Sequence, residues 1–135
     1  METRRKPNSM STDHQTVAVL GASANPERYA NRAVRALLAA GHRVIPVTPA
    51  HGAIEGLEPV ASVADIAEPV DTLTLYVGPD RLRGMTDAIA ALRPGRVIFN
   101  PGTECPELAA RLDAEGIRHQ DACTLVLLST GQFAA

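Results

Sequence analysis

The chain has 135 residues, a formal net charge of −2, two Tyr, two Phe and no Trp. This length suits one domain with a hydrophobic core, and the slight acidic excess and scarce aromatic rings exclude broad binding of nucleic acid or anionic membranes. Since no apolar run is long enough to span a membrane and no secretory apolar region is present, we expect a cytoplasmic protein without nucleic-acid or membrane partners.

Strand-like and helix-like segments alternate along the chain. Residues 1–15 are polar and lack periodicity, which predicts a flexible leader before a folded domain at residues 16–135. In chain order, hydrophobic periodicity and Gly or Pro stops predict a strand at Val17–Leu20, a helix at Tyr29–Ala40, a strand at Arg43–Val47, a helical stretch around Val63–Ile66, a strand at Thr72–Val77, a helix along Leu82–Leu92, a strand at Arg96–Phe99, a helix at Pro106–Glu115 and a strand near Ile117–His119. The final apolar run, Ala122–Leu128, is expected to pack against the sheet, and the sequence leaves its type open.

This alternation predicts a single α/β domain with a Rossmann-like, doubly wound, parallel five-stranded sheet. Ligands of such sheets bind at the carboxyl ends of the strands. The candidate site segments are therefore the short polar connections after the strands, at Gly21–Asn25, Thr48-Pro49, Gly78-Pro79 and Asn100–Glu104.

The positions of the lysine, cysteine and histidine residues limit which kinds of reactive or metal site the chain could contain. The only lysine, Lys6, lies in the polar leader, which excludes a Walker loop and a Schiff-base lysine in a pocket. Cys105 and Cys123 are far apart in the sequence, and both are expected to be reduced. Cys123 precedes an apolar run and is expected to be a buried core thiol. The four histidines lack the spacing of metal ligands, so no metal site is predicted.

The connection after the first strand lacks the pattern of a NAD site but can still bind a phosphate group. A nicotinamide-binding turn normally carries three glycines and an acidic residue after the second strand, whereas here the turn has only Gly21 and no carboxylate follows until Glu55. The helix that follows Ser23 still presents unpaired N–H groups and a positive dipole end. Arg28 or Arg32 on that helix suits a phosphate, because a guanidinium pairs with phosphate oxygens.

Several segments in a fixed order carry a resemblance to a known family. They are Gly21–Arg28 (GASANPER), Arg43–Pro49 (RVIPVTP), Val70–Pro79 (VDTLTLYVGP), Ile98–Glu104 (IFNPGTE) and Ala122–Phe133 (ACTLVLLSTGQF). Together they resemble the small stand-alone CoA-binding-domain proteins, which share their fold with the nucleotide-binding domain of the succinyl-CoA synthetase alpha subunit. The resemblance runs from about Thr16 to Phe133 and implies a domain that binds coenzyme A non-covalently, without established catalysis.

The resemblance also implies which residues contact the ligand. The diphosphate is expected at Gly21, Ala22 and Ser23, with Asn31 on the phosphate side at the start of the first helix. The remaining contacts are expected at Val47, Thr48 and Pro49 for the adenine and ribose, at Val77, Gly78 and Pro79 beside the nucleotide, and at Asn100 and Gly102 in the turn that faces the pantetheine. Two positions depart from the family pattern, since Thr48 and Cys105 stand where asparagine is common.

Three functions are compatible with these residues. The first is a module that binds CoA or an acyl-CoA without catalysis. The second is an enzyme that uses the same cleft for acyl or phosphoryl transfer, although no Ser-His-Asp order or paired-carboxylate spacing supports it. The third is a redox regulator in which Cys105, expected near the mouth of the cleft, forms a mixed disulfide with the CoA thiol. A homodimer is a further expectation, because small α/β domains often pair.

Overall fold

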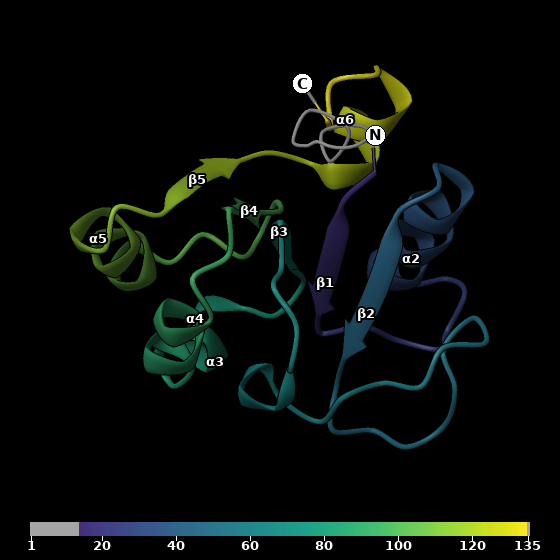
Figure 1. Cartoon of the computed structure of the whole chain (residues 1–135), viewed down its shortest axis with the longest axis horizontal. Coiled ribbons are helices and arrows are strands. Elements are labelled where there is room, and N and C mark those ends of the chain that lie inside the picture. Colours follow the sequence, from purple (N-terminus) through teal and green to yellow (C-terminus); the bar gives the residue numbers. More distant parts are fainter. Residues whose placement is uncertain (1–13, 135) are drawn as a thin grey trace, which may run out of the picture.

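The computed structural model describes residues 14–134, and positions 1–13 of the predicted leader lie outside the described residues. One sheet of parallel strands has the order β2-β1-β3-β4-β5 (Figure 1). In chain order the strands are β1 (Thr16–Leu20), β2 (Arg43–Val47), β3 (Thr72–Leu75), β4 (Arg96–Phe99) and β5 (Arg118–Asp121). The predicted single α/β domain with a Rossmann-like, doubly wound, parallel five-stranded sheet is confirmed.

Gln15, which the sequence places in the leader, is bonded to the sheet. Its N–H donates to His42 Nδ1 at 2.9 Å, its carbonyl accepts from Arg43 N–H at 2.9 Å, and its Oε1 accepts from the Thr72 hydroxyl at 2.6 Å. Burial lowers the pKa of His42, which favours the neutral ring that can accept the first of these bonds. The ordered fold therefore includes Gln15.

Helices cover both faces of the sheet. On one face, α2 (Tyr29–Ala39) and α6 (Thr124–Ser129) contact each other. The other face carries the 3-10 turn η1 (Val63–Asp65), α3 (Pro79–Arg83), α4 (Thr86–Leu92) and α5 (Pro106–Ala114). In Figure 1, α2 lies to the right of the central strands and α3, α4 and α5 lie to the left. Between residues 14 and 134, no helix has the length and hydropathy needed to cross a bilayer.

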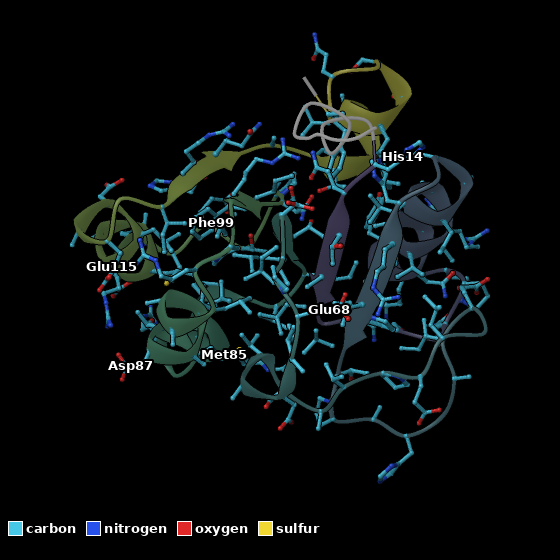
Figure 2. The ribbon with its side chains drawn as sticks, in the orientation of Figure 1. His14, Glu68, Met85, Asp87, Phe99 and Glu115 are labelled. Carbon is cyan, nitrogen blue, oxygen red and sulfur yellow. The ribbon has the colours of Figure 1, made fainter. Side chains whose placement is uncertain are left out.

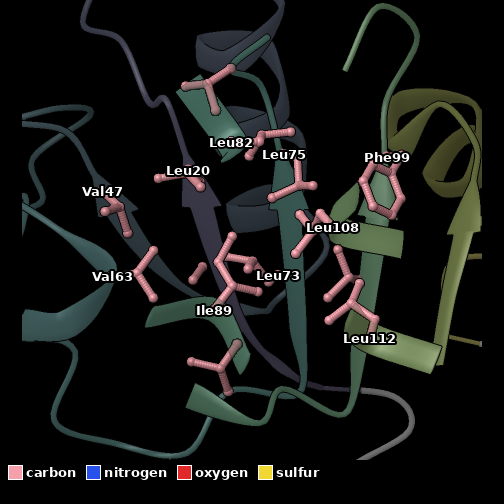
Figure 3. Packing of buried hydrophobic residues seen from close by; sticks show 14 of the residues in the cluster. Leu20, Val47, Val63, Leu73, Leu75, Leu82, Ile89, Phe99, Leu108 and Leu112 are labelled. Atoms are coloured by element: carbon pink, nitrogen blue, oxygen red, sulfur yellow. The ribbon is translucent and has the colours of Figure 1, made fainter. Parts of the chain in front are cut away.

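The central strand β1 shows how helices on both faces make the core. Val17 and Val19 join the cluster beneath α2 and α6, whereas Ala18 and Leu20 join the cluster beneath α3, α4 and α5. All four side chains are buried, as expected for a parallel strand that is covered on both faces. Figure 3 shows the second cluster, which includes Leu20, Val47, Val63, Leu73, Leu75, Leu82, Ile89, Phe99, Leu108 and Leu112.

The continuous helix predicted along Leu82–Leu92 is wrong, because the segment is divided into α3 and α4. Gly84 and Met85 donate their N–H groups in i→i+3 bonds, which tighten the chain after α3. The Thr86 hydroxyl then donates to the Leu82 carbonyl at 3.2 Å, in competition with a regular helical bond. The apolar stripe that suggested one helix is still buried against the sheet, but two helices supply it.

Two strand limits and the C-terminal run complete the comparison with the sequence. β3 ends at Leu75 rather than Val77, because its neighbour β1 has already ended. β5 continues to Asp121, beyond the predicted end at His119. This edge strand is polar and partly exposed, so its hydrophobic pattern is weak. The run Ala122–Leu128 contains the start of α6.

Candidate functional site

The connection after β1 lies where the strand order reverses. The strands on either side of β1 are β2 and β3, so the carboxyl end of β1 is the switch point at which such sheets bind ligands. Gly21 follows β1 directly and has a φ of +89°. The N–H groups of Gly21 and Ala22 both donate to the Val47 carbonyl, at 2.9 and 3.2 Å. A Cβ on Gly21 would lie 2.8 Å from Val77 Cγ1, so the turn fits here only without a side chain.

Polar side chains shape the loop that leads into α2. Ser23 Oγ accepts from the Asn25 N–H at 3.1 Å, and Asn25 Oδ1 accepts from the Glu27 N–H at 3.0 Å. Arg28 then occupies the N-cap position of α2 without a side-chain capping bond, and the first turn of α2 contains no acidic residue. The positive end of this helix is therefore not neutralised by its own first turn, which leaves it able to attract an anion.

The Asn31 side chain fixes the loop before α2 by hydrogen bonds. Its side chain is buried, and its Nδ2 donates to the Ser23 carbonyl at 2.9 Å and to Glu55 Oε2 at 3.1 Å. Its Oδ1 accepts from Arg35 Nε at 2.8 Å. These bonds fix the position of Ser23 relative to α2. Direct contact between Asn31 and a phosphate of the ligand stays a prediction. Glu55, the first carboxylate after β2, therefore accepts a hydrogen bond from the Asn31 side-chain amide.

A first cavity of about 250 Å³ opens at the carboxyl ends of β1 and β2. Five residues singled out from the sequence line it: Gly21, Val47, Thr48, Pro49 and Val77. The rest of its wall comes from the end of β1, from η1 and the residues before it, and from α3, α4 and the turn between them, namely Leu20, Ala61, Ser62, Val63, Ala64, Arg81, Gly84, Met85 and Ala88. Figure 2 labels Met85 on the side of α3 and α4 that faces η1. The wall is mainly apolar, as an adenine ring requires.

Sequence reasoning missed Ser62 and Arg81 in this wall. The long loop after β2 folds back, because the Thr48 N–H donates to the Val60 carbonyl at 2.9 Å and the Val60 N–H donates to the Pro46 carbonyl at 3.0 Å. That pairing brings Ser62 beside the end of β2. No motif in the loop signals it, since the pairing depends on tertiary contacts.

A second cavity of about 280 Å³ lies on the face of the sheet that carries α2 and α6. It is lined by Tyr29, Tyr76, Asn100, Pro101, Cys123 and Leu125. Tyr29 is the first residue of α2, and its exposed ring lies 5.3 Å from the Arg32 guanidinium carbon. The second cavity therefore borders the same helix end that follows the Gly21 turn.

Asn100 ties together three elements at this cavity. Its Nδ2 donates to the Thr74 hydroxyl at 2.7 Å and to the Leu75 carbonyl at 2.8 Å, both at the end of β3. Its Oδ1 accepts from the N–H of Thr124, the first residue of α6, at 2.9 Å. The buried Tyr76 Oη, close to the Thr74 and Thr124 hydroxyls, has no partner of hydrogen-bonding geometry among residues 14–134, and burial raises the pKa of Tyr76 to about 12.

Eight predicted residues line neither cavity: Ala22, Ser23, Arg28, Asn31 and Arg32 before and within α2, and Gly78, Pro79 and Gly102 in later connections. Gly78 is the N-cap residue of α3, and Pro79 is its first residue. Gly102 has a φ of +90°, and its N–H donates to Glu104 Oε1 at 3.1 Å. These positions have clear local roles in ending strands and starting turns. Their contact with a ligand stays a prediction.

The two cysteines lie in different surroundings from those expected. Cys105, expected at the mouth of the cleft, is only 2% exposed, and its Sγ lies 4.0 Å from the Pro79 carbonyl oxygen and 3.6 Å from Glu107 Oε1. Cys123, expected to be a core thiol, is partly exposed and lines the second cavity. The sequence expectation was wrong because both cysteines precede helices, and only the packing of α5 and α6 distinguishes them.

A sequence profile described as a CoA binding domain matches residues 15–129. The chain belongs to the CoA binding domain family. The matched range contains the Gly21 turn, the uncapped start of α2 and every lining residue of the two cavities. The family resemblance drawn from the sequence is thereby confirmed.

Two solved structures are similar to this chain over nearly their whole length. One crystal structure of an uncharacterized protein has 40% sequence identity and a TM-score of 0.85, over 89% of this chain and 98% of that chain. The structure of cell-free ID.343 from Thermus thermophilus has 36% identity and a TM-score of 0.81, over 88% and 90% of the two chains. The uncharacterized protein YneT of Bacillus subtilis (strain 168) is 30% identical over 71 residues. That alignment spans about half of the curated relative, 53% of each chain.

Proposed function

We propose that this CoA binding domain protein holds coenzyme A or an acyl-CoA non-covalently at the carboxyl ends of the strands, without catalysing a reaction of its own. One observation carries the proposal: the side-chain-free turn at Gly21 leads into a helix whose positive end has no side-chain cap and no acidic residue in its own first turn. An anion beside that helix would accept hydrogen bonds from its first-turn N–H groups.

The diphosphate of CoA is the anion that we assign to this helix end. Ser23 is anchored there by Asn31, and its hydroxyl can donate because its oxygen already accepts from the Asn25 N–H. Arg28 is exposed at the N-cap, where a guanidinium can pair with phosphate oxygens. Each charge-assisted bond of this kind contributes about 1.5–3 kcal/mol.

The two cavities would take the two ends of the ligand. Gly21 lines the first cavity and Tyr29 lines the second, so the loop between them connects the cavities. We assign the adenosine to the first cavity, against Val47 and Pro49, and the pantetheine to the second, beside Asn100. This placement uses the carboxyl-terminal edge of the sheet, where ligands of doubly wound domains bind.

A binding role is favoured over histidine-based catalysis by the positions of His42 and His119. His42 accepts from the Gln15 N–H at the amino-terminal end of β1, and His119 bonds Asp113 at 2.8 Å. Neither histidine lines the two cavities. We keep the cytoplasm as the proposed compartment, since both cysteines are free thiols. A homodimer stays a prediction.

Calorimetric titration with CoA, ADP and NAD tests the proposed function. We expect CoA to bind most tightly and ADP more weakly, because ADP lacks the pantetheine that would fill the second cavity. NAD should bind weakest, since the first carboxylate after β2, Glu55, already accepts a bond from Asn31. Equal affinities for all three would indicate a general nucleotide cleft, and no binding of any would contradict the proposal.

Thiol labelling tests the pantetheine end of the assignment. Cys123 lines the second cavity, whereas Cys105 is buried, so iodoacetamide should modify Cys123 first. Saturating acetyl-CoA, which has no free thiol to consume the reagent, should then slow the labelling of Cys123 by several-fold and leave Cys105 unaffected. Cys105→Ser and Cys123→Ser form a matched pair of controls for intact-mass measurement. Labelling of Cys123 that acetyl-CoA does not change would place the pantetheine elsewhere.

A further inference from the structure

Ion pairing divides the arginines of the described chain into two groups. Four of them contact carboxylates across element boundaries: Arg43 with Glu68 at 2.6 Å, Arg83 with Glu107 at 3.1 Å, Arg93 with Glu115 at 3.3 Å, and Arg111 with Asp87 at 2.7 Å. Arg81 belongs to the other group, with Arg28, Arg32, Arg35, Arg96 and Arg118, because no carboxylate between residues 14 and 134 lies within ion-pair distance of it. Its charge is therefore available to a ligand.

Arg81 lines the first cavity and is the one charged residue in its described wall. It lies in the last turn of α3, across the cavity from Thr48 at the end of β2 and Ser62 before η1. Its neighbour Asp80 is held by Arg83, which keeps the nearest carboxylate along α3 occupied. A mainly apolar wall with one unpaired cation is suited to an aromatic base that carries an additional phosphate.

Asp65 is the acidic residue of η1, whose other two residues, Val63 and Ala64, line the cavity. Its Oδ2 accepts from the Ser62 hydroxyl at 3.0 Å, and Asp65 itself does not line the cavity. Thr48 Oγ1 accepts from the Ala50 N–H at 3.3 Å, so its hydroxyl hydrogen can be donated to a ligand oxygen. Thr48 and Arg81 together offer a hydroxyl donor and a guanidinium to an anion in this cavity.

We propose that Arg81 binds the 3′-phosphate on the ribose of CoA, so that the site selects CoA over dephospho-CoA. This inference rests on the proposed function, because it requires the adenosine to occupy the first cavity. CoA carries two separate anionic groups, a diphosphate and a phosphate monoester. At the carboxyl ends of the strands, the described chain offers two separate cationic features, the end of α2 and Arg81, and the arginines of α2 belong to the first. Arg32 lies over the Tyr29 ring, and Arg35 bonds Asn31 and the Pro26 carbonyl.

Titration of the full chain with CoA and dephospho-CoA tests this assignment. The wild-type protein should bind CoA about tenfold more tightly or better, the size expected for one charge-assisted contact. Arg81→Gln should weaken CoA by about that factor and leave dephospho-CoA unchanged, so that the preference disappears. Arg81 is exposed on a short surface helix, so the variant should fold, and circular dichroism checks that it does.

Two further variants make the test specific. Arg28→Gln should weaken CoA and dephospho-CoA equally, because both carry the diphosphate. Arg43→Gln removes the same charge at the opposite edge of the sheet and should change neither affinity. Equal weakening of both ligands by Arg81→Gln, or no weakening, would overturn the inference. Equal affinity of the wild-type protein for both ligands would also overturn it while CoA binding stands, whereas binding of neither would overturn the proposed function as well.

Discussion

Gly21→Ala is expected to lower the stability of the protein and to remove most of its affinity for CoA. An alanine at a φ of +89° is strained by about 1–3 kcal/mol. Its Cβ would also lie 2.8 Å from Val77 Cγ1 and 2.9 Å from the Tyr76 carbonyl oxygen. The Val77 side chain could rotate, but the backbone carbonyl belongs to the continuation of β3 and resists movement. The turn itself must therefore shift, and the first cavity and the start of α2 would shift with it.

Gly56→Ala is the matched control for this prediction. Gly56 has a φ of +80°, and a Cβ there meets nothing within 4 Å, so the variant carries the backbone strain without the collision. Urea denaturation should show a larger loss of unfolding free energy for Gly21→Ala than for Gly56→Ala. Titration should show CoA affinity lost only in Gly21→Ala. A folded Gly21→Ala protein with unchanged CoA affinity would remove the turn from the site.

The fold follows from the sequence because its local signals agree with its packing. Val17–Leu20 is apolar throughout and becomes a central strand that is buried on both faces. Gly41 has a φ of +89° just after α2, so the glycine that predicts the end of the helix also adopts the conformation that ends it. Local preference and tertiary packing select the same elements here, which is why most of the helices and strands and the parallel sheet could be expected.

The errors lie where local signals are weak or ambiguous. The stripe of Leu82 and Ile89 fits one long helix and equally fits two short helices, and the i→i+3 bonds of Gly84 and Met85 decide between them. The edge strand β5 is polar, so hydrophobic periodicity cannot define its limits. In both cases the pattern of apolar residues does not determine where a helix or strand begins and ends.

The sequence could predict the site residues that directly follow strands, but not those that tertiary packing brings to the site. Strand ends such as Val47 and Thr48 were identified because parallel strands place their ligand contacts there. Ser62 reaches the first cavity through the return of the loop at Val60, and Arg81 reaches it from α3. No local pattern encodes either placement. The different exposure of the two thiols likewise depends on how α5 and α6 pack.

Asn100→Ala is the second variant with a large expected effect. Asn100 is 2% exposed, and its removal would leave the buried Leu75 carbonyl and the Thr124 N–H without their present partners. Each unsatisfied buried group costs about 1–3 kcal/mol, so we expect a loss of about 2–5 kcal/mol in the free energy of unfolding. Chemical denaturation measures this loss directly. A loss below about 1 kcal/mol, the net value of one ordinary hydrogen bond, would contradict the structural role of the amide.

Asn100→Asp separates the donor from the acceptor role of this amide. The carboxylate can still accept from the Thr124 N–H, but it faces the Leu75 carbonyl without a proton to donate. Burial should raise the pKa of the new carboxyl group above its ordinary value. Its protonated form should therefore be the better tolerated one, so the stability deficit relative to the wild-type protein should be smallest at acidic pH and should grow as the pH rises through the raised pKa. A deficit independent of pH would contradict a buried, donor-dependent site.

The same residue connects stability to the proposed ligand. Asn100 bonds the end of β3 to the first residue of α6, and it lines the second cavity. If the pantetheine occupies that cavity, Asn100→Ala should weaken CoA more than ADP, because ADP extends no further than the diphosphate. Measured at a temperature where the variant is fully folded, this ratio is independent of the loss in stability. An equal change for both ligands would mean that the second cavity does not hold the pantetheine, and the site would then end at the start of α2.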